Sequence, residues 1–197
     1  MATQTTRDHL IDVGVTLMHR NGYHATGLNE ILASAQVPKG SFYHYFGSKE
    51  DFAVAVLERY AARVGEHCET VLSDTNLPPL KRLRRYFAEL IKIYGQKGDI
   101  PGCMVGKFSL EAADHSTILR KHLSGSFNHW QHGLSAVLRQ ARDQKELPPD
   151  ADPDSLAGFL INSWQGALLR SLAEKSDDPL KTFLHYTFDS LLSHKSN

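Results

Sequence analysis

Apolar residues recur every three or four positions through most of this chain. This spacing matches the 3.6-residue period of an amphipathic helix. The pattern therefore predicts an all-α protein of about nine helices. They are expected from Thr5 or Thr6 to Asn21, and then over residues 28–35, 39–45, 49–72, 80–96, 103–111, 116–143, 153–172 and 179–192.

Residues with known capping preferences stand at the ends of these predicted helices. Asn21-Gly22 forms a C-terminal signal for the first helix, and Thr26 is expected to cap the second. Ser48 with Asp51 resembles a capping box. Asp152-Pro153 and Asp178-Pro179 place proline at the first turn of the last two helices. The helix boundaries follow from these signals.

The short helix at residues 39–45 is unusually rich in aromatic side chains. Phe42, Tyr45 and Phe46 lie three and four positions apart, so we expect them to face inward. Tyr43 and His44 are then left on the outside. With two helices before it and a tight turn at Gln36-Val37-Pro38, the arrangement is typical of a helix-turn-helix. Taken alone, the segment is also compatible with a small aromatic core element.

The outward side of this helix has the chemistry of a DNA-reading surface. Lys39, Gly40 and Ser41 lie at its N-terminus, where free N–H groups and the helix dipole attract phosphate. Tyr43 and His44 carry donors and flat apolar faces that suit base edges. The partner expected from these residue types is double-stranded DNA.

Three runs carry a family resemblance. Residues 31–33, 37–46 and 48–52, with Val37-Pro38-Lys39-Gly40-Ser41-Phe42-Tyr43-His44-Tyr45-Phe46 at their centre, resemble the signature of TetR-family transcriptional regulators, which covers roughly residues 7 to 55. Gln36 and Pro38 depart from the commonest pattern, in which glycine and Ser or Thr stand. The resemblance implies that the residues approaching DNA are Thr26, Lys39, Gly40, Ser41, Tyr43, His44 and Lys49.

The resemblance also implies two domains with separate functions. Residues 1–48 are expected to form the DNA-binding domain, and residues 49–197 an all-helical ligand-binding and dimerisation domain. A C₂ dimer would bind a pseudo-palindromic operator. An unknown small-molecule inducer would release it, and repression is the family's usual outcome.

The last two helices are expected to pair with their copies in a second chain. Their apolar stripes exceed what one core requires, and the last stripe has near-heptad spacing. The alternative is that they only close the core of one chain. The expected interface residues are Leu156, Phe159, Leu160, Phe183, Leu184, Phe188 and Leu191.

Aromatic side chains of the body supply candidates for a ligand pocket, although plain core packing is the alternative for each. Cys103 and Lys107 would be its polar or reactive members. The candidates are Tyr86, Phe87, Tyr94, Cys103, Lys107, Phe108, Phe127, Trp130 and Trp164.

Cys103 also suggests an alternative mode of sensing. It stands at a predicted helix N-terminus with Lys107 four residues later, and both features favour a thiolate. The segment around it resembles a branch of the family that responds to reactive or unsaturated small molecules. A redox or electrophile sensor is therefore an alternative to a small buried core residue. Cys68 is the only other cysteine, which excludes a disulfide framework.

Charge and composition limit the remaining function classes. Lys plus Arg and Asp plus Glu number 22 each, so binding to DNA by bulk charge is not expected and the salt dependence should be moderate. Residues 81–85 are the most basic run, and a solvated helical face is favoured for them over a DNA contact. No signal peptide or membrane span is found, which indicates a cytoplasmic protein.

No catalytic, metal or cofactor motif is present. The HExxH, GxSxG, Walker and dinucleotide patterns are missing, so an enzyme or a cofactor is not expected. His115, His122, His129 and His132 follow one flank of a helix, but without acidic or cysteine partners they favour solvated histidines over zinc. A helical protein-interaction module and an enzyme without a recognisable motif are the remaining alternatives.

Overall fold

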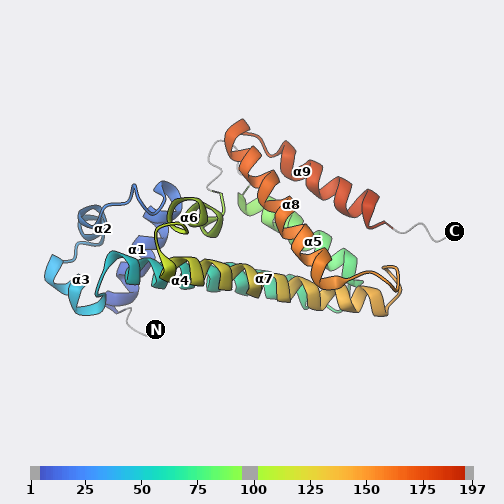
Figure 1. Cartoon of the computed structure of the whole chain (residues 1–197), viewed down its shortest axis with the longest axis horizontal. Helices are drawn as coiled ribbons and strands as arrows, with labels where there is room; N and C mark the ends of the chain where they lie inside the picture. The colour runs from blue at the N-terminus through green and yellow to red at the C-terminus, as the bar shows by residue number, and fades with distance from the viewer. Residues whose placement is uncertain (1–4, 95–101, 194–197) are drawn as a thin grey trace. The chain divides into compact units, whose positions relative to one another are not determined.

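The computed structural model describes residues 5–94 and 102–193, apart from the side chains of residues 67 and 68. Every regular element in these ranges is helical, as predicted (Figure 1). The elements are α1 (Thr6–Asn21), α2 (Leu28–Ala35), α3 (Lys39–Tyr45), α4 (Lys49–Leu72), α5 (Pro79–Tyr94), α6 (Met104–Ala112), α7 (Thr117–Asp143), α8 (Pro153–Glu174), α9 (Asp178–Leu184) and the π-helix η1 (His185–Leu191). The end of the fifth predicted helix, residues 95–96, and Cys68 as a side chain lie outside the described part.

The chain divides into two compact units that do not follow a single cut in the sequence. The first holds residues 1–65 and 103–126, and the second holds residues 66–102 and 127–197. The long helices α4 and α7 each supply residues to both units. The boundary predicted after residue 48 separates DNA binding from ligand binding and dimerisation, whereas these units are defined by packing. That functional boundary stays a prediction.

The first unit is built on the predicted capping signals, with one exception. Thr5 caps α1 by accepting a hydrogen bond from the Asp8 N–H (3.1 Å), and Gly22 ends α1 with a φ of 90°. The prediction that Thr26 caps α2 is wrong, because the N-cap is Gly27. The Thr26 side chain is fully buried, and its hydroxyl donates to the Gly22 carbonyl at 2.7 Å. Thr26 therefore fastens the turn between α1 and α2.

Three phenylalanines form the centre of this unit. Phe42, Phe46 and Phe52 contact one another with ring centroids 4.9 to 5.3 Å apart. Gly14 allows α1 to approach α4 closely, because a Cβ there would lie 2.4 Å from the Phe52 ring. These contacts fix the short helix α3 to α1 and α4.

An ion-pair network joins the same two long helices at the surface. The Arg59 guanidinium contacts Asp8 at 2.5 Å and Asp12 at 2.6 Å, and Arg63 contacts Asp12 at 2.7 Å. All four residues lie on α1 or α4. The network therefore joins α1, the helix that precedes the helix-turn-helix, to α4.

The second unit is organised around an aromatic cluster. The ring of Phe87 on α5 contacts Trp164 on α8 at 5.3 Å, Phe183 on α9 at 5.0 Å and Phe188 on η1 at 5.8 Å. Figure 1 shows α8 and α9 side by side. These rings form the core of the unit.

The near-heptad stripe predicted for the last helix ends early. The α-helix stops at Leu184, and residues 185–191 continue as a π-helix. A wider turn rotates the following side chains, so that Thr187 and Phe188 are buried while Leu191 is 69% exposed. The prediction of one continuous α-helical stripe over residues 179–192 is therefore wrong in its second half.

The basic run at residues 81–85 is not a uniformly solvated face. Arg82 is buried, and it donates to the Leu72 carbonyl at 2.9 Å and to the Gln140 side-chain oxygen at 2.5 Å. Arg84 and Arg85 are exposed. The helical period turns Arg82 toward the core, where it caps the last carbonyl of α4.

Candidate nucleic-acid interface

The short helix α3 separates its residues into an anchored side and an open side. Phe42 and Phe46 are 0% and 4% exposed, whereas Tyr43 is 53% exposed. Lys39, Gly40 and His44 are also exposed. The sequence-based division is confirmed for these residues.

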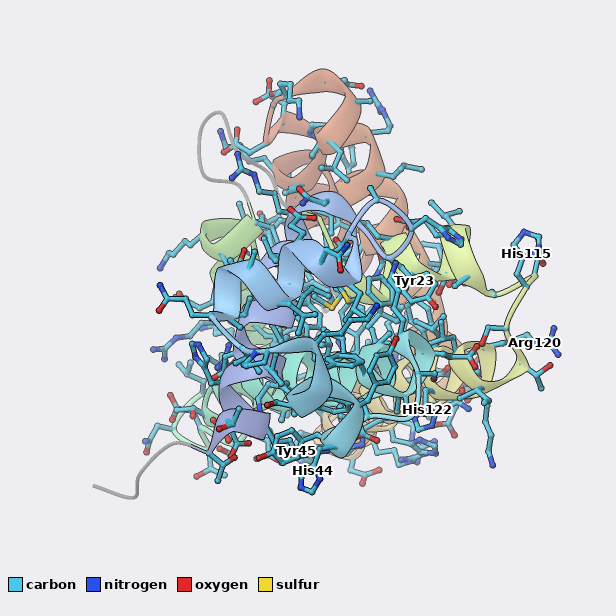
Figure 2. The ribbon with its side chains drawn as sticks, turned by 90° about the vertical axis from the view of Figure 1, so that its left-hand side faces the viewer. Tyr23, His44, Tyr45, His115, Arg120 and His122 are labelled. Carbon is cyan, nitrogen blue, oxygen red and sulfur yellow. The ribbon has the colours of Figure 1, made fainter. Side chains whose placement is uncertain are left out.

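Tyr45 is the exception, because it was expected to face inward and is instead 38% exposed. At about 100° per residue it lies roughly 60° from Phe42 on the side opposite Phe46, beyond the edge of the buried face. Tyr43 occupies the other flank, and Gly40 and His44 lie between them. Figure 2 shows His44 and Tyr45 projecting together into solvent, and their rings are 4.9 Å apart. The open side of α3 therefore presents two tyrosines and a histidine.

The N-terminal end of α3 is open. Pro38 is its N-cap and provides no side-chain cap, since proline has no polar group. Ser41 is half-buried, and the N–H of Ser41 bonds the Pro38 carbonyl at 3.0 Å. The exposed Lys39 and Gly40 leave room for an anionic group at this end.

Two residues expected at the DNA surface are tied into the fold. Lys49 is half-buried, donates to the Tyr23 carbonyl at 2.7 Å, and lies 4.6 Å from the centroid of the Tyr23 ring. Burial lowers the pKa of Lys49, and the negative charge of Glu111 opposes that shift. Thr26 is fully buried and bonded within the turn, and its expected approach to DNA stays a prediction.

The ligand-pocket candidates fall into separate groups. Tyr86, Phe87, Tyr94 and Trp164 are all buried and share the aromatic cluster of the second unit. Phe127 and Trp130 on α7 belong to the same unit and are half-buried. Which of these groups meets a ligand stays a prediction.

The other three candidates belong to α6 in the first unit. Phe108 packs against the Tyr23 ring at 5.6 Å, and the Lys107 amine donates to the carbonyls of His19 (2.7 Å) and Arg20 (3.3 Å). Cys103 is a half-buried free thiol and the N-cap of α6, without a side-chain cap bond. Lys107 thus fastens α6 to the end of α1, a role that the sequence pattern did not reveal.

Buried donors without acceptors mark the second unit. The indole N–H groups of Trp130 and Trp164 and the amide nitrogen of Gln165 are buried and have no hydrogen-bond partner within the described ranges. An indole N–H and an amide NH₂ can only donate. Leaving such a group unpaired costs about 1–3 kcal/mol, which an acceptor-bearing molecule can recover.

The helix α8 carries an exposed seam that the sequence pattern only partly indicated. Leu160 is 0% exposed, and Phe183 and Phe188 are each 7% exposed, so these three belong mainly to the core of the protomer. Leu156 and Leu184 are half-buried. Phe159 and Leu191 are exposed as expected. Among the exposed positions of α8, five are spaced alternately three and four apart: Phe159, Asn162, Gly166, Leu169 and Ala173.

The histidines do not gather a metal site within the described ranges. No group of three or more His, Cys, Asp or Glu residues there is arranged to hold a metal ion. His122 lies 3.8 Å from Glu58, and the His132 ring bonds the Asn128 carbonyl at 2.7 Å. Among the described residues, no helix combines the length and the apolar character that crossing a membrane requires.

Comparison with known proteins gives matches over nearly the whole chain. Residues 10–56 match the family described as bacterial regulatory proteins, tetR family, and residues 79–187 match the tetracyclin repressor-like C-terminal domain. The HTH-type transcriptional repressor DhaR of Mycobacterium sp. (strain GP1) is 36% identical over 197 residues, covering 100% of this chain and 98% of that protein. The HTH-type transcriptional repressor NemR of Escherichia coli (strain K12) is 35% identical over 179 residues, covering 91% and 90%.

Solved structures agree with the sequence matches. The reduced form of E. coli NemR superposes with a TM-score of 0.88 at 33% identity, covering 96% of this chain and 98% of that one. The regulatory protein TetR from Rhodobacter sphaeroides superposes with a TM-score of 0.87 at 34% identity, covering 94% and 98%. With one family match spanning more than half of its length and repressor relatives above 30% identity, this chain belongs to the TetR family of transcriptional regulators.

Proposed function

We propose that this regulator is a homodimeric repressor that binds a pseudo-palindromic DNA operator and is released by a small-molecule inducer. Residues 1–48 would read DNA, and residues 49–197 would bind the inducer and form the dimer. As a TetR-family member the protein is a transcriptional regulator and not an enzyme. The observation that carries the proposal is the open side of α3 on an anchored base.

DNA reading is supported by the contrast within α3. A side chain that only fills a core is buried, yet Tyr43, His44 and Tyr45 are all exposed while Phe42 is 0% exposed. Two phenolic hydroxyls and an imidazole can bond phosphates or base edges in a major groove. Lys39 and the free N–H groups at the helix start add a site for a backbone phosphate.

Dimer formation is supported by the exposed seam on α8. Its 3-4 spacing is the one that two helices share when they pack along a common seam. The seam combines the large Phe159 and Leu169 with the small Gly166 and Ala173, which allow close approach. A dimer would place two copies of α3 in successive major grooves, about 34–36 Å apart.

The unpaired donors of the second unit support a class of inducer. The Trp164 indole N–H lies within a cluster of aromatic rings, so its surroundings are apolar. A ligand for this place has an apolar body and at least one hydrogen-bond acceptor, such as a carbonyl or ether oxygen. Such a ligand releases the protein from DNA only if it binds the conformation that cannot hold DNA more tightly than the conformation that can.

The test is a gel-shift titration with the DNA that flanks the gene for this protein, against unrelated competitor DNA. A double variant, Tyr43→Ala with His44→Ala, is expected to lose at least about tenfold in operator affinity, because both residues are exposed on α3. His115→Ala serves as the matched control, since His115 is exposed and lies well away from His44 (Figure 2).

Three readings decide the outcome. A specific shift that the double variant loses and the control keeps supports the proposal. A shift that survives the double variant contradicts the assignment of α3, and the absence of any specific shift contradicts DNA reading. The slope of log affinity against log salt should be moderate, since the chain carries equal numbers of acidic and basic residues.

A further inference from the structure

Helix α6 is fastened to the end of α1 and to the turn between α1 and α2. Lys107 donates to the carbonyls of His19 and Arg20 in the last turn of α1, where the helix has no further N–H groups of its own to offer them. One turn later on the same face of α6, Glu111 meets the turn itself. Both residues lie in the same compact unit as α1, α2 and α3.

Glu111 holds His24 through two separate atoms. Its carboxylate accepts a hydrogen bond from the His24 backbone N–H at 2.8 Å. The ring Nε2 of His24 lies 3.0 Å from the Glu111 backbone carbonyl, a bond in which Nε2 donates its proton. A charged acceptor on a backbone N–H is among the stronger hydrogen bonds in proteins. The turn is therefore held at its backbone, where its position is set.

Gly22 shows how closely the carboxylate fits this turn. A Cβ on Gly22 would lie 2.1 Å from the Glu111 Oε1 atom, far inside contact distance. Gly22 also has a φ of 90°, a conformation that favours glycine. A side chain at this position would strain the backbone of the turn and would displace the Glu111 carboxylate.

The same turn is bonded to a residue just before α2 and to the first residue of α4, which lie on either side of α3 in the sequence. The Gly22 carbonyl accepts the Thr26 hydroxyl just before α2, and the Tyr23 carbonyl accepts the Lys49 amine at the start of α4. Burial lowers the pKa of Lys49, and the negative charge of the Glu111 carboxylate acts on the same amine and opposes that shift. Three consecutive residues, Gly22 to His24, thus connect Glu111 to the elements on both sides of α3.

We propose that Glu111 is a positioning residue for operator binding, which holds the turn between α1 and α2 so that α2 and α3 take the orientation that DNA requires. This inference rests on the proposed function, because it concerns how well α3 is aimed. Glu111 itself need not touch DNA. The sequence alone placed it only as an acidic residue near the end of a short helix.

The experiment compares Glu111→Ala, Glu111→Gln and Asp114→Ala in the full-length protein. Asp114 is an exposed acidic residue just beyond α6 and serves as the matched control. Each variant is titrated against the operator fragment at two DNA concentrations. One, far above Kd, gives the fraction of active protein, and the other, far below Kd, gives Kd itself.

We expect Glu111→Ala to raise Kd about tenfold while the active fraction stays full, because the charge-assisted bond to the His24 N–H is lost. Glu111→Gln keeps a side-chain oxygen that can accept the His24 N–H, so its Kd should stay within about threefold of the wild type. Asp114→Ala should behave as the wild type.

Three results would overturn the inference. The first is a Glu111→Ala variant whose Kd for the operator and active fraction both equal those of the wild type. The second is a Glu111→Ala variant with a reduced active fraction but an unchanged Kd, which marks a purely structural role. The third is a Glu111→Gln variant that binds the operator as weakly as Glu111→Ala. If the wild type itself gives no specific shift, the proposed function fails first, and with it the basis for this inference. A loss of binding confined to the Tyr43 and His44 variant leaves the proposed function intact and refutes only the role of Glu111.

Discussion

Individual side chains in this protein are used for purposes that their type alone does not reveal. Thr26 has the residue type of a helix cap but is buried and bonds the preceding turn. Lys49 has the type of a phosphate contact but bonds the Tyr23 carbonyl. In each case a tertiary partner competes with solvent or ligand for the same polar group. Residue-level roles therefore need the partner as well as the side chain.

Asp8 carries a prediction at this scale. Its pKa is held below the ordinary value, first by the hydrogen bond from the Thr5 hydroxyl and then by Arg59. A carboxyl whose folded pKa is depressed stabilises the fold above its unfolded pKa, and that stabilisation is lost as pH falls through the folded pKa. The contribution of Asp8 should thus be present at pH 7 and fade below about pH 4.

The measurement is urea unfolding of the wild type and of Asp8→Asn at about pH 7 and near pH 3, on either side of the ordinary carboxyl pKa. The variant should be less stable at neutral pH, and the gap should narrow at the lower pH. Asp150→Asn, in the exposed loop before α8, should change the free energy of unfolding by less than about 0.5 kcal/mol at neutral pH. If the difference in free energy of unfolding between the wild type and Asp8→Asn does not change with pH, the ionised Asp8 carboxylate is not its cause.

At the scale of elements, the helix ends followed the capping signals closely, and the exceptions arose where packing intervened. Pro153 and Pro179 stand in the first turns of α8 and α9 as expected. The last helix, however, changes from α to π at His185 while Phe183 and Phe188 both enter the aromatic cluster. The π-helix is rare in proteins, and the apolar spacing of this segment gives no signal for it.

The basic run on α5 provides the prediction at the element scale. Arg82→Ala removes the hydrogen bonds to the Leu72 carbonyl and to Gln140 and leaves a cavity, so it should lower the free energy of unfolding by about 2–4 kcal/mol. Arg85→Ala is the matched control on the same helix. Arg85 is exposed and pairs with Asp74 at 3.2 Å, a surface contact that contributes about 0–1 kcal/mol.

Denaturant unfolding at neutral pH separates the two variants. Equal losses for Arg82→Ala and Arg85→Ala would mean that burial of Arg82 does not govern its contribution. If DNA binding by the wild type depends more steeply on salt than binding by Arg85→Ala, then residues 81–85 contact DNA.

At the scale of the whole molecule, the exposed seam of α8 predicts how the chain assembles. Gly166 is exposed, and nothing lies within 4 Å of where its Cβ would stand. Gly166→Leu should therefore leave the protomer folded, and even favour its helix by about 0.5–1 kcal/mol. In a dimer that packs along this seam, the same leucine would hold the two copies of α8 apart.

Light scattering after size exclusion, at micromolar concentration, tests this expectation. Gly166→Leu should elute as a monomer with helical circular dichroism and should bind the operator at least about tenfold more weakly, since one protomer reaches only one half-site. Gly133→Leu is the control, since Gly133 is an exposed glycine of α7 with equally open surroundings. A dimeric Gly166→Leu would move the interface to another face of the protein.

The sequence by itself determined the helical class, most helix ends, the anchored and open sides of α3, and the resemblance that led to the family. All of these rest on periodicity, capping and motif order, which act between residues close together along the chain. Only the tertiary structure decided that Tyr45 is exposed, that Arg82 is buried, that Leu160 belongs to the core and that Glu111 holds the turn before α2. These facts depend on contacts between residues far apart in the sequence, such as the 87 positions between His24 and Glu111, and no local pattern encodes them.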